Sequence, residues 1–177
     1  AQQIDDEDTL IHALNNIGTA EFDAGDPDSD PQLRRSLELA LAAGFHEHAA
    51  RAYTNLGCEL LIADRHAGAD AVLDQGVAYC VEHDLASWEI YMTSWQARSA
   101  LEQADFVGAE RAAQAVLDRH STPPSTITAL VVIALLRARR GDPDPHTPLE
   151  QAQVLADGTG ERQRLEPVAR ARAELRW

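Results

Sequence analysis

Apolar residues recur along the chain at the spacing of one face of an α-helix. Tyr53, Leu56, Gly57 and Leu60 fall at positions i, i+3, i+4 and i+7, and residues 66–83 show a similar spacing. No stretch shows the strict alternation that predicts a strand. The pattern predicts nine helices near residues 6–23, 31–43, 46–63, 66–83, 86–103, 106–120, 124–140, 147–157 and 161–177.

Proline and glycine mark where these helices begin and end. Pro31, Pro123 and Pro148 each follow an Asp or Thr, which places a capping oxygen before a proline that the first helical turn tolerates. Gly44 and Gly141 stand where helices are expected to end, because glycine readily adopts the left-handed conformation there. The connections are short, and short connections make neighbouring helices antiparallel.

The chain also resembles itself at a period of about 39 residues. The string Gly-Asp-Pro-Asp begins at Gly25 and again 116 residues later at Gly141, which is three such periods. Gly68 and Gly108 begin a second pair of similar strings, 40 residues apart. Small residues recur in apolar surroundings at a similar interval, at Gly18, Gly57, Ala97 and Ala134.

A two-helix unit of this length cannot bury its apolar stripe alone, so successive units are expected to stack. We therefore predict an all-α chain, a right-handed α-solenoid of about four and a half antiparallel helical hairpins. It is expected to be a single repeat domain over residues 1–177. Its hairpins are predicted at 6–43, 46–83, 86–120 and 124–157, with a half-repeat at 161–177.

Residues 53–60, followed by Ala69, Leu73 and Gly76, resemble the tetratricopeptide repeat (TPR). Residues 42–60, 129–143 and 161–175 are similar to the helical-repeat region of large ATP-dependent LuxR-type transcriptional regulators of high-GC bacteria. This resemblance implies a nucleotide-hydrolysing module upstream and a helix-turn-helix downstream. Since neither lies within these 177 residues, we expect the sequence to be a piece of a longer chain.

The TPR resemblance also implies where a ligand would bind. In such hairpins the first helix lines a concave groove, and the groove positions carry over to a set of candidate binding residues: Asn15, Arg51, Thr54, Tyr91, Ser94, Arg98 and Arg172. The guanidinium groups of Arg51 and Arg98 would clamp an anion or an acidic peptide. In the alternative interpretation, each arginine pairs with one of the many surface carboxylates.

The chemical inventory disfavours an enzyme. All 15 basic residues are arginine, so mechanisms that need a lysine amine are excluded. No nucleophile motif or phosphate-binding glycine run occurs. His46 and His48 lie on different helical faces, and Cys80 with His83 has no second ligand pair, so we expect no metal and no cofactor.

Charge and hydropathy bear on the partners. The chain has 29 acidic residues and a net charge of −14, so we expect no direct contact with nucleic acid. The longest apolar stretch, residues 127–136, is shorter than the roughly 20 residues that cross a bilayer, so no membrane association is predicted. Only two cysteines occur, which favours a reducing, cytoplasmic location.

These observations predict a non-catalytic interaction or sensor module of a bacterial transcriptional regulator. Its groove is expected to bind a protein or peptide partner, or a small effector. Two alternatives remain open: a free-standing adaptor that binds peptides, and a self-association module that forms a homodimer through its end repeats.

Overall fold

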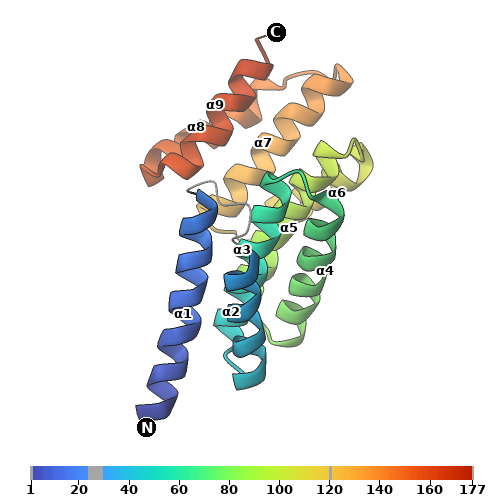
Figure 1. Cartoon of the computed structure of the whole chain (residues 1–177). Coiled ribbons are helices and arrows are strands. Elements are labelled where there is room, and N and C mark those ends of the chain that lie inside the picture. Colours follow the sequence, from blue (N-terminus) through green and yellow to red (C-terminus); the bar gives the residue numbers. More distant parts are fainter. Residues whose placement is uncertain (1, 24–29, 120, 177) are drawn as a thin grey trace. The chain divides into compact units, whose positions relative to one another are not determined.

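The computed structural model describes residues 2–23, 30–119 and 121–176, and every regular element in these ranges is an α-helix (Figure 1). The helices are α1 (Gln2–Asp23), α2 (Asp30–Ala43), α3 (His46–Ile62), α4 (His66–Glu82), α5 (Ala86–Glu102), α6 (Phe106–Leu117), α7 (Pro123–Arg140), α8 (His146–Thr159) and α9 (Arg162–Glu174). The prediction of an all-α chain is confirmed. Most predicted helix limits agree within three residues, although α1 already begins at Gln2. Residues 24–29, 120 and 177 of the predicted hairpins lie outside the described ranges.

The chain divides into two compact units, Ala1–Glu89 (unit 1) and Ile90–Trp177 (unit 2), with the boundary inside α5. In unit 1, α1 packs on α2, α2 on α3, and α3 on α4. The first helices of its two hairpins, α1 and α3, also pack on one another. Part of the core of this unit consists of Ile11, Ala40 and Ala49, which are fully buried.

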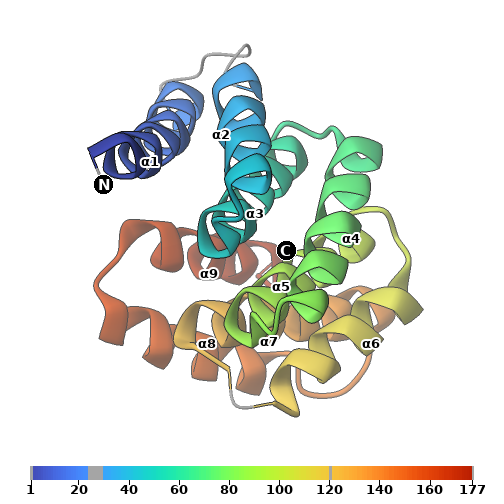
Figure 2. The ribbon, with the colours of Figure 1, turned by 90° about the horizontal axis from the view of Figure 1, so that it is seen from below.

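Unit 2 shows the same kind of serial packing (Figure 2). Its α6 packs on α7, α7 on α8, and α8 on α9, while the first helices α7 and α9 also contact each other. One core cluster joins residues of α5, α6 and α7, and a second joins α7, α8 and α9 around Leu149 and Val168. Within each unit, this pattern is consistent with a helical repeat.

One turn geometry recurs every 20 residues from α2 to α6. Gly44, Asp64, Asp84 and Ala104 each end a helix in the left-handed conformation, with φ of 70°, 57°, 56° and 61°. The next residue then donates its N–H to the carbonyl five positions back, as in Phe45 N to Ala40 O at 2.9 Å. This is the Schellman motif. Two such helix-turn modules account for the period of about 40 residues in the sequence.

The recurring small residues are sites of close helix packing. A Cβ added at Gly18 would lie 2.8 Å from Leu33 Cγ, and one added at Gly57 would lie 2.6 Å from Leu73 Cδ2. Forty residues further along, Ala97 replaces the glycine, and the position that corresponds to Leu73 is Ala113. Both alanines are fully buried in one core cluster. A larger residue on the first helix thus accompanies a smaller one on the second.

Candidate functional site

The first-helix side chains of unit 2 bring two arginines onto two aromatic rings. The Arg98 guanidinium lies 5.1 Å from the centre of the Trp95 ring, and the Arg164 guanidinium lies 5.5 Å from the centre of the Tyr91 ring. The two rings meet edge to face, with 6.4 Å between their centroids. We call Tyr91, Trp95, Arg98 and Arg164 the arginine–aromatic cluster. Its three α5 residues are half-buried, and so is Arg164 from α9.

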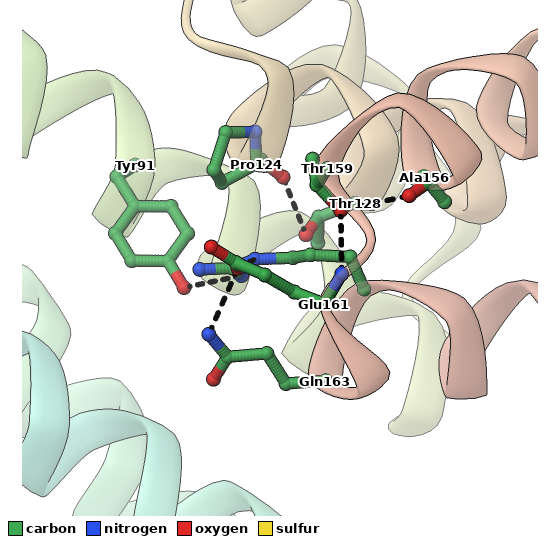
Figure 3. A network of polar contacts seen from close by, with 8 residues as sticks. Tyr91, Pro124, Thr128, Ala156, Thr159, Glu161 and Gln163 are labelled. Carbon is green, nitrogen blue, oxygen red and sulfur yellow. Dashed lines mark hydrogen bonds and ion pairs between the residues drawn. The ribbon is translucent and has the colours of Figure 1, made fainter.

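Hydrogen bonds hold Arg164 in place in this cluster, and Figure 3 shows Tyr91, Glu161 and Gln163 of the surrounding network. Arg164 Nη1 donates to the Tyr91 hydroxyl at 2.9 Å, and its Nε faces Glu161 Oε2 at 3.4 Å. Glu161 in turn accepts a hydrogen bond from Gln163 Nε2 at 3.0 Å, and its backbone N–H donates to Thr159 Oγ1. The hydrogen bond from Gln163 contributes most to lowering the pKa of the Glu161 carboxyl, and Arg164 lowers it further. The carboxylate beside Arg164 is therefore ionised over a wide pH range.

The second arginine of the cluster is held by its own helix. Arg98 Nε donates to Glu102 Oε1 at 2.8 Å, one turn further along α5. The indole Nε1–H of Trp95 is buried and has no hydrogen-bond partner in the described part of the chain. The cluster thus presents two cations, which suit a ligand that carries hydrogen-bond acceptors.

The net charge of the chain resides in unit 1. Residues 1–89 contain 18 acidic residues and 4 arginines, for a net charge of −14, whereas residues 90–177 contain 11 of each and are neutral. Most of the guanidinium groups that can bind an anion therefore belong to unit 2. Because unit 2 is neutral, it does not repel an anionic ligand in the way that the net charge of the whole chain would suggest.

In unit 1, a row of polar contacts joins the first helices α1 and α3. Arg51 Nη1 donates to His12 Nδ1 at 3.0 Å, because arginine can only act as a donor. Deeper in the same interface, Asn55 Nδ2 donates to Asn15 Oδ1 at 2.7 Å and to Thr19 Oγ1 at 3.2 Å. These contacts fix the register of the two helices, and Arg51 is half-buried among them.

Three of the predicted binding residues are buried. Asn15 and Thr54 are each 1% exposed, and Ser94 is fully buried. The Thr54 and Ser94 hydroxyls donate to carbonyls of their own helices, Ala50 O at 2.8 Å and Tyr91 O at 2.7 Å. Tyr91 and Arg98 lie together in the cluster, whereas Arg51 belongs to unit 1. Arg172 is exposed near the end of α9.

A stack of rings lies where α3 begins and α4 ends in unit 1. The His83 ring lies 4.1 Å from both the Tyr79 and the His46 rings, between centroids. Tyr79 also exchanges a hydrogen bond with His46 Nδ1 at 2.6 Å. Burial raises the pKa of the adjacent Cys80 thiol to about 11, so this thiol is protonated at neutral pH and is a poor nucleophile. The described residues contain no group of three or more His, Cys, Asp or Glu that could hold a metal ion.

The chain matches no family model, no curated protein and no solved structure.

The arginine–aromatic cluster contains two residues that the groove positions did not predict, Trp95 on α5 and Arg164 on α9. The sequence contains a signal for Arg164, because Arg164, Val168 and Ala171 stand at i, i+4 and i+7 and share the buried face of α9. A lone cation on an apolar helical face needs a specific partner, here the Tyr91 ring and hydroxyl.

No helix in the described ranges is long and apolar enough to cross a membrane.

Proposed function

We propose that this chain is a non-catalytic interaction module that binds a protein partner or a small effector through exposed faces of its first helices. The observation that carries this proposal is the arginine–aromatic cluster of Tyr91, Trp95, Arg98 and Arg164. Its rings hold both guanidinium groups in fixed positions, so less side-chain conformational entropy is lost when a ligand binds. Aromatic rings and arginine are also the residues most enriched at binding hot spots.

The existing ion pairs of the cluster do not block a ligand. The Arg164 side chain is 16% exposed while its partner Glu161 is 52% exposed, and their contact of 3.4 Å is long for an ion pair. Such surface pairs contribute about 0–1 kcal/mol, so a ligand carboxylate can replace Glu161 at little cost. The Arg98–Glu102 pair is shorter, at 2.8 Å, and is expected to persist in a complex.

We further propose that the hairpins of both units belong to one TPR-like right-handed solenoid, in which the first helices line a concave groove. The α1–α3 and α7–α9 contacts and the turn that recurs every 20 residues support this arrangement. In the regulator version of the proposal, the groove is the sensor part of a cytoplasmic LuxR-type transcriptional regulator. A complete reading frame that encodes no nucleotide-hydrolysing module and no helix-turn-helix would rule that version out.

Thermal unfolding with a panel of ligands tests binding at the cluster. The panel contains sugars, nucleotides, a hexaglutamate peptide and its glutamine counterpart, because these separate neutral, planar and carboxylate ligands. A ligand at a hundred times its Kd stabilises the fold by about 2.7 kcal/mol. Arg98→Gln and Arg164→Gln should remove that stabilisation. The control Arg170→Gln should retain it, because the Arg170 side chain is 75% exposed and lies outside the cluster on α9, the helix of Arg164.

Salt dependence distinguishes the peptide-binding adaptor from the effector sensor. Binding of hexaglutamate that weakens steeply with added salt would support an adaptor for acidic segments, while a neutral sugar should respond little. If no ligand in the panel stabilises the protein, or if the Arg170→Gln variant loses as much stabilisation as the cluster variants, the assignment of the cluster is wrong.

Self-association is a second candidate function, and a specific feature of α1 favours it. Leu10 and Ile17 are 49% and 47% exposed and lie seven residues apart, which places them on one face of the helix. A second copy would bury this stripe. Light scattering over a range of concentrations should then show a dimer that Leu10→Glu with Ile17→Glu abolishes. A monomer at every concentration removes this function.

A further inference from the structure

A depression in the surface of unit 2 lies between the start of α8 and the end of α9. Its volume is about 190 Å³, and it is lined by His146, Leu149, Glu150, Arg172, Leu175 and Arg176. None of these residues belongs to the arginine–aromatic cluster. The lining combines two guanidinium groups, one imidazole and one carboxylate with two leucine side chains.

The two arginines of this depression are not paired with an acid in the described part of the chain. Within residues 2–23, 30–119 and 121–176, neither Arg172 nor Arg176 forms an ion pair. Glu174, which stands between them in sequence, is already engaged by Arg139 through contacts of 2.8 and 3.2 Å. Both carboxylate oxygens of Glu174 are engaged in this pairing, which raises the pKa of Arg139.

One of the backbone amide groups at the start of α8 is already engaged. Asp144 Oδ1 accepts the Thr147 N–H at 3.1 Å, which occupies one of the free donors of the first turn. The same hydrogen bond lowers the pKa of Asp144, so this carboxylate is ionised at neutral pH. The arginine side chains are the cationic hydrogen-bond donors that line the depression.

The leucine residues give the depression an apolar floor. Leu149 is 3% exposed and packs in one cluster with Val168 and Ala171, and Leu175 packs against that cluster. Drug-sized ligands occupy pockets of about 300–1,000 Å³, so the depression fits a group no larger than one amino-acid residue.

We propose that this depression binds a small carboxylate that carries an apolar side chain, either a free N-acyl amino acid or the C-terminal residue of a peptide. The carboxylate pairs with Arg172 and Arg176, since guanidinium groups match its two oxygens. The apolar side chain covers Leu149 and Leu175, and Glu150 accepts the ligand's amide N–H. This second site does not depend on the proposed function, because it uses none of the cluster residues.

Amide chemical-shift changes on titration with N-acetyl-L-leucine test the site, up to about 20 mM because a ligand this small binds in the millimolar range. Saturable shifts confined to the start of α8 and the end of α9 are expected. N-acetyl-L-leucinamide lacks the carboxylate and sodium acetate lacks the apolar part, and both should bind at least tenfold more weakly. Equal binding of the leucinamide would overturn the proposal, as would the absence of saturable shifts.

Single substitutions separate the site from general surface charge. Arg172→Gln and Arg176→Gln should each weaken N-acetyl-L-leucine binding about tenfold, because a hydrogen bond to a charged group is worth about that much. Glu150→Gln should bind N-acetyl-L-leucine at least as tightly as the wild type does. The substitution removes a negative charge beside the ligand carboxylate and keeps an oxygen that accepts the amide N–H. The matched control is Arg170→Gln on the same helix, whose partner is Glu166 at 2.6 Å. If the control loses as much affinity as the other two arginine variants, the site is wrongly placed.

Two peptides identify the source of the carboxylate. A pentapeptide that ends in leucine is compared with the same peptide in its C-terminally amidated form. Binding of the free-acid peptide that is more than tenfold tighter than that of N-acetyl-L-leucine assigns the site to peptide C-termini. Similar affinities assign it to free N-acyl amino acids. If the amidated peptide binds as well as the free acid, the carboxylate does not determine binding and the proposal fails.

Discussion

Replacing Gly57 with alanine tests whether helix packing, rather than helix propensity, determines the small residues of the repeat. The new Cβ would lie 2.6 Å from Leu73 Cδ2 and 2.8 Å from Leu73 Cγ, closer than unbonded carbons approach. Leu73 is fully buried and has little room to move. Overpacking of this kind costs about 1–3 kcal/mol. Alanine in place of glycine within a helix stabilises by about 1 kcal/mol. Gly57→Ala should therefore lower the free energy of unfolding by up to about 2 kcal/mol.

The sign of the effect should reverse when Leu73 is shortened. In a Leu73→Ala background the clash is gone, so Gly57→Ala should stabilise by about 1 kcal/mol through helix propensity alone. The coupling between the two substitutions is then about 1–3 kcal/mol, which is the cost of the clash itself. The double variant reproduces the natural combination of Ala97 and Ala113, found 40 residues further along.

Urea unfolding of the four proteins of this cycle, followed by circular dichroism, measures the coupling. Gly68→Ala is the matched control, because its Cβ would lie 3.6 Å from Leu60 Cδ1, an ordinary contact. If Gly57→Ala and Gly68→Ala change the midpoint equally, or if Leu73→Ala leaves the effect of Gly57→Ala unchanged, then close packing does not explain the glycine.

Three further predictions concern the turns, the buried thiol and a helix cap. Ala104→Gly should raise the free energy of unfolding by about 0.5–1 kcal/mol in urea titrations, because its φ of 61° is unfavourable for alanine. Gly141→Ala, with no atom near the new Cβ, should lower it by about 1 kcal/mol. Cys80 is less acidic folded than unfolded, so pH titrations should show unit 1 losing stability between pH 9 and about 11, whereas Cys80→Ala should remove that part of the loss. Asp105→Ala removes the acceptor of the Gly108 N–H, and calorimetry should show a loss of about 1 kcal/mol, while a change below a few tenths would show that the cap is unimportant.

The sequence was sufficient to predict the helices, because their ends carry strong local signals. Gly44 and Gly141 end helices in the left-handed conformation, as expected. Asp64, Asp84 and Ala104 do the same without a glycine; aspartate adopts this conformation more readily than most residues, whereas nothing in the residue type of Ala104 predicts it. The left-handed conformation costs such residues only about 1–2 kcal/mol, which the Schellman hydrogen bonds and the packing of the flanking helices offset.

The candidate site was less predictable, because helix rotation decides which side chains are accessible. A shift of one residue turns a side chain by about 100° around the helix axis. Asn15, Thr54 and Ser94 fall on groove positions by repeat numbering, yet each is buried. Arg164 contacts Tyr91 across 73 residues of sequence, and no local pattern specifies such a pairing.

The recurring turn makes the helix-turn modules of this chain interchangeable in principle. A tandem copy of residues 45–84 would place Phe45 directly after Asp84, and that junction has the same left-handed residue followed by the same backbone hydrogen bond as the existing one after Gly44. Unequal recombination within the coding region could thus lengthen or shorten the protein by 40 residues without a new loop. Proteins of this type are accordingly expected to vary in hairpin number more readily than in hairpin length.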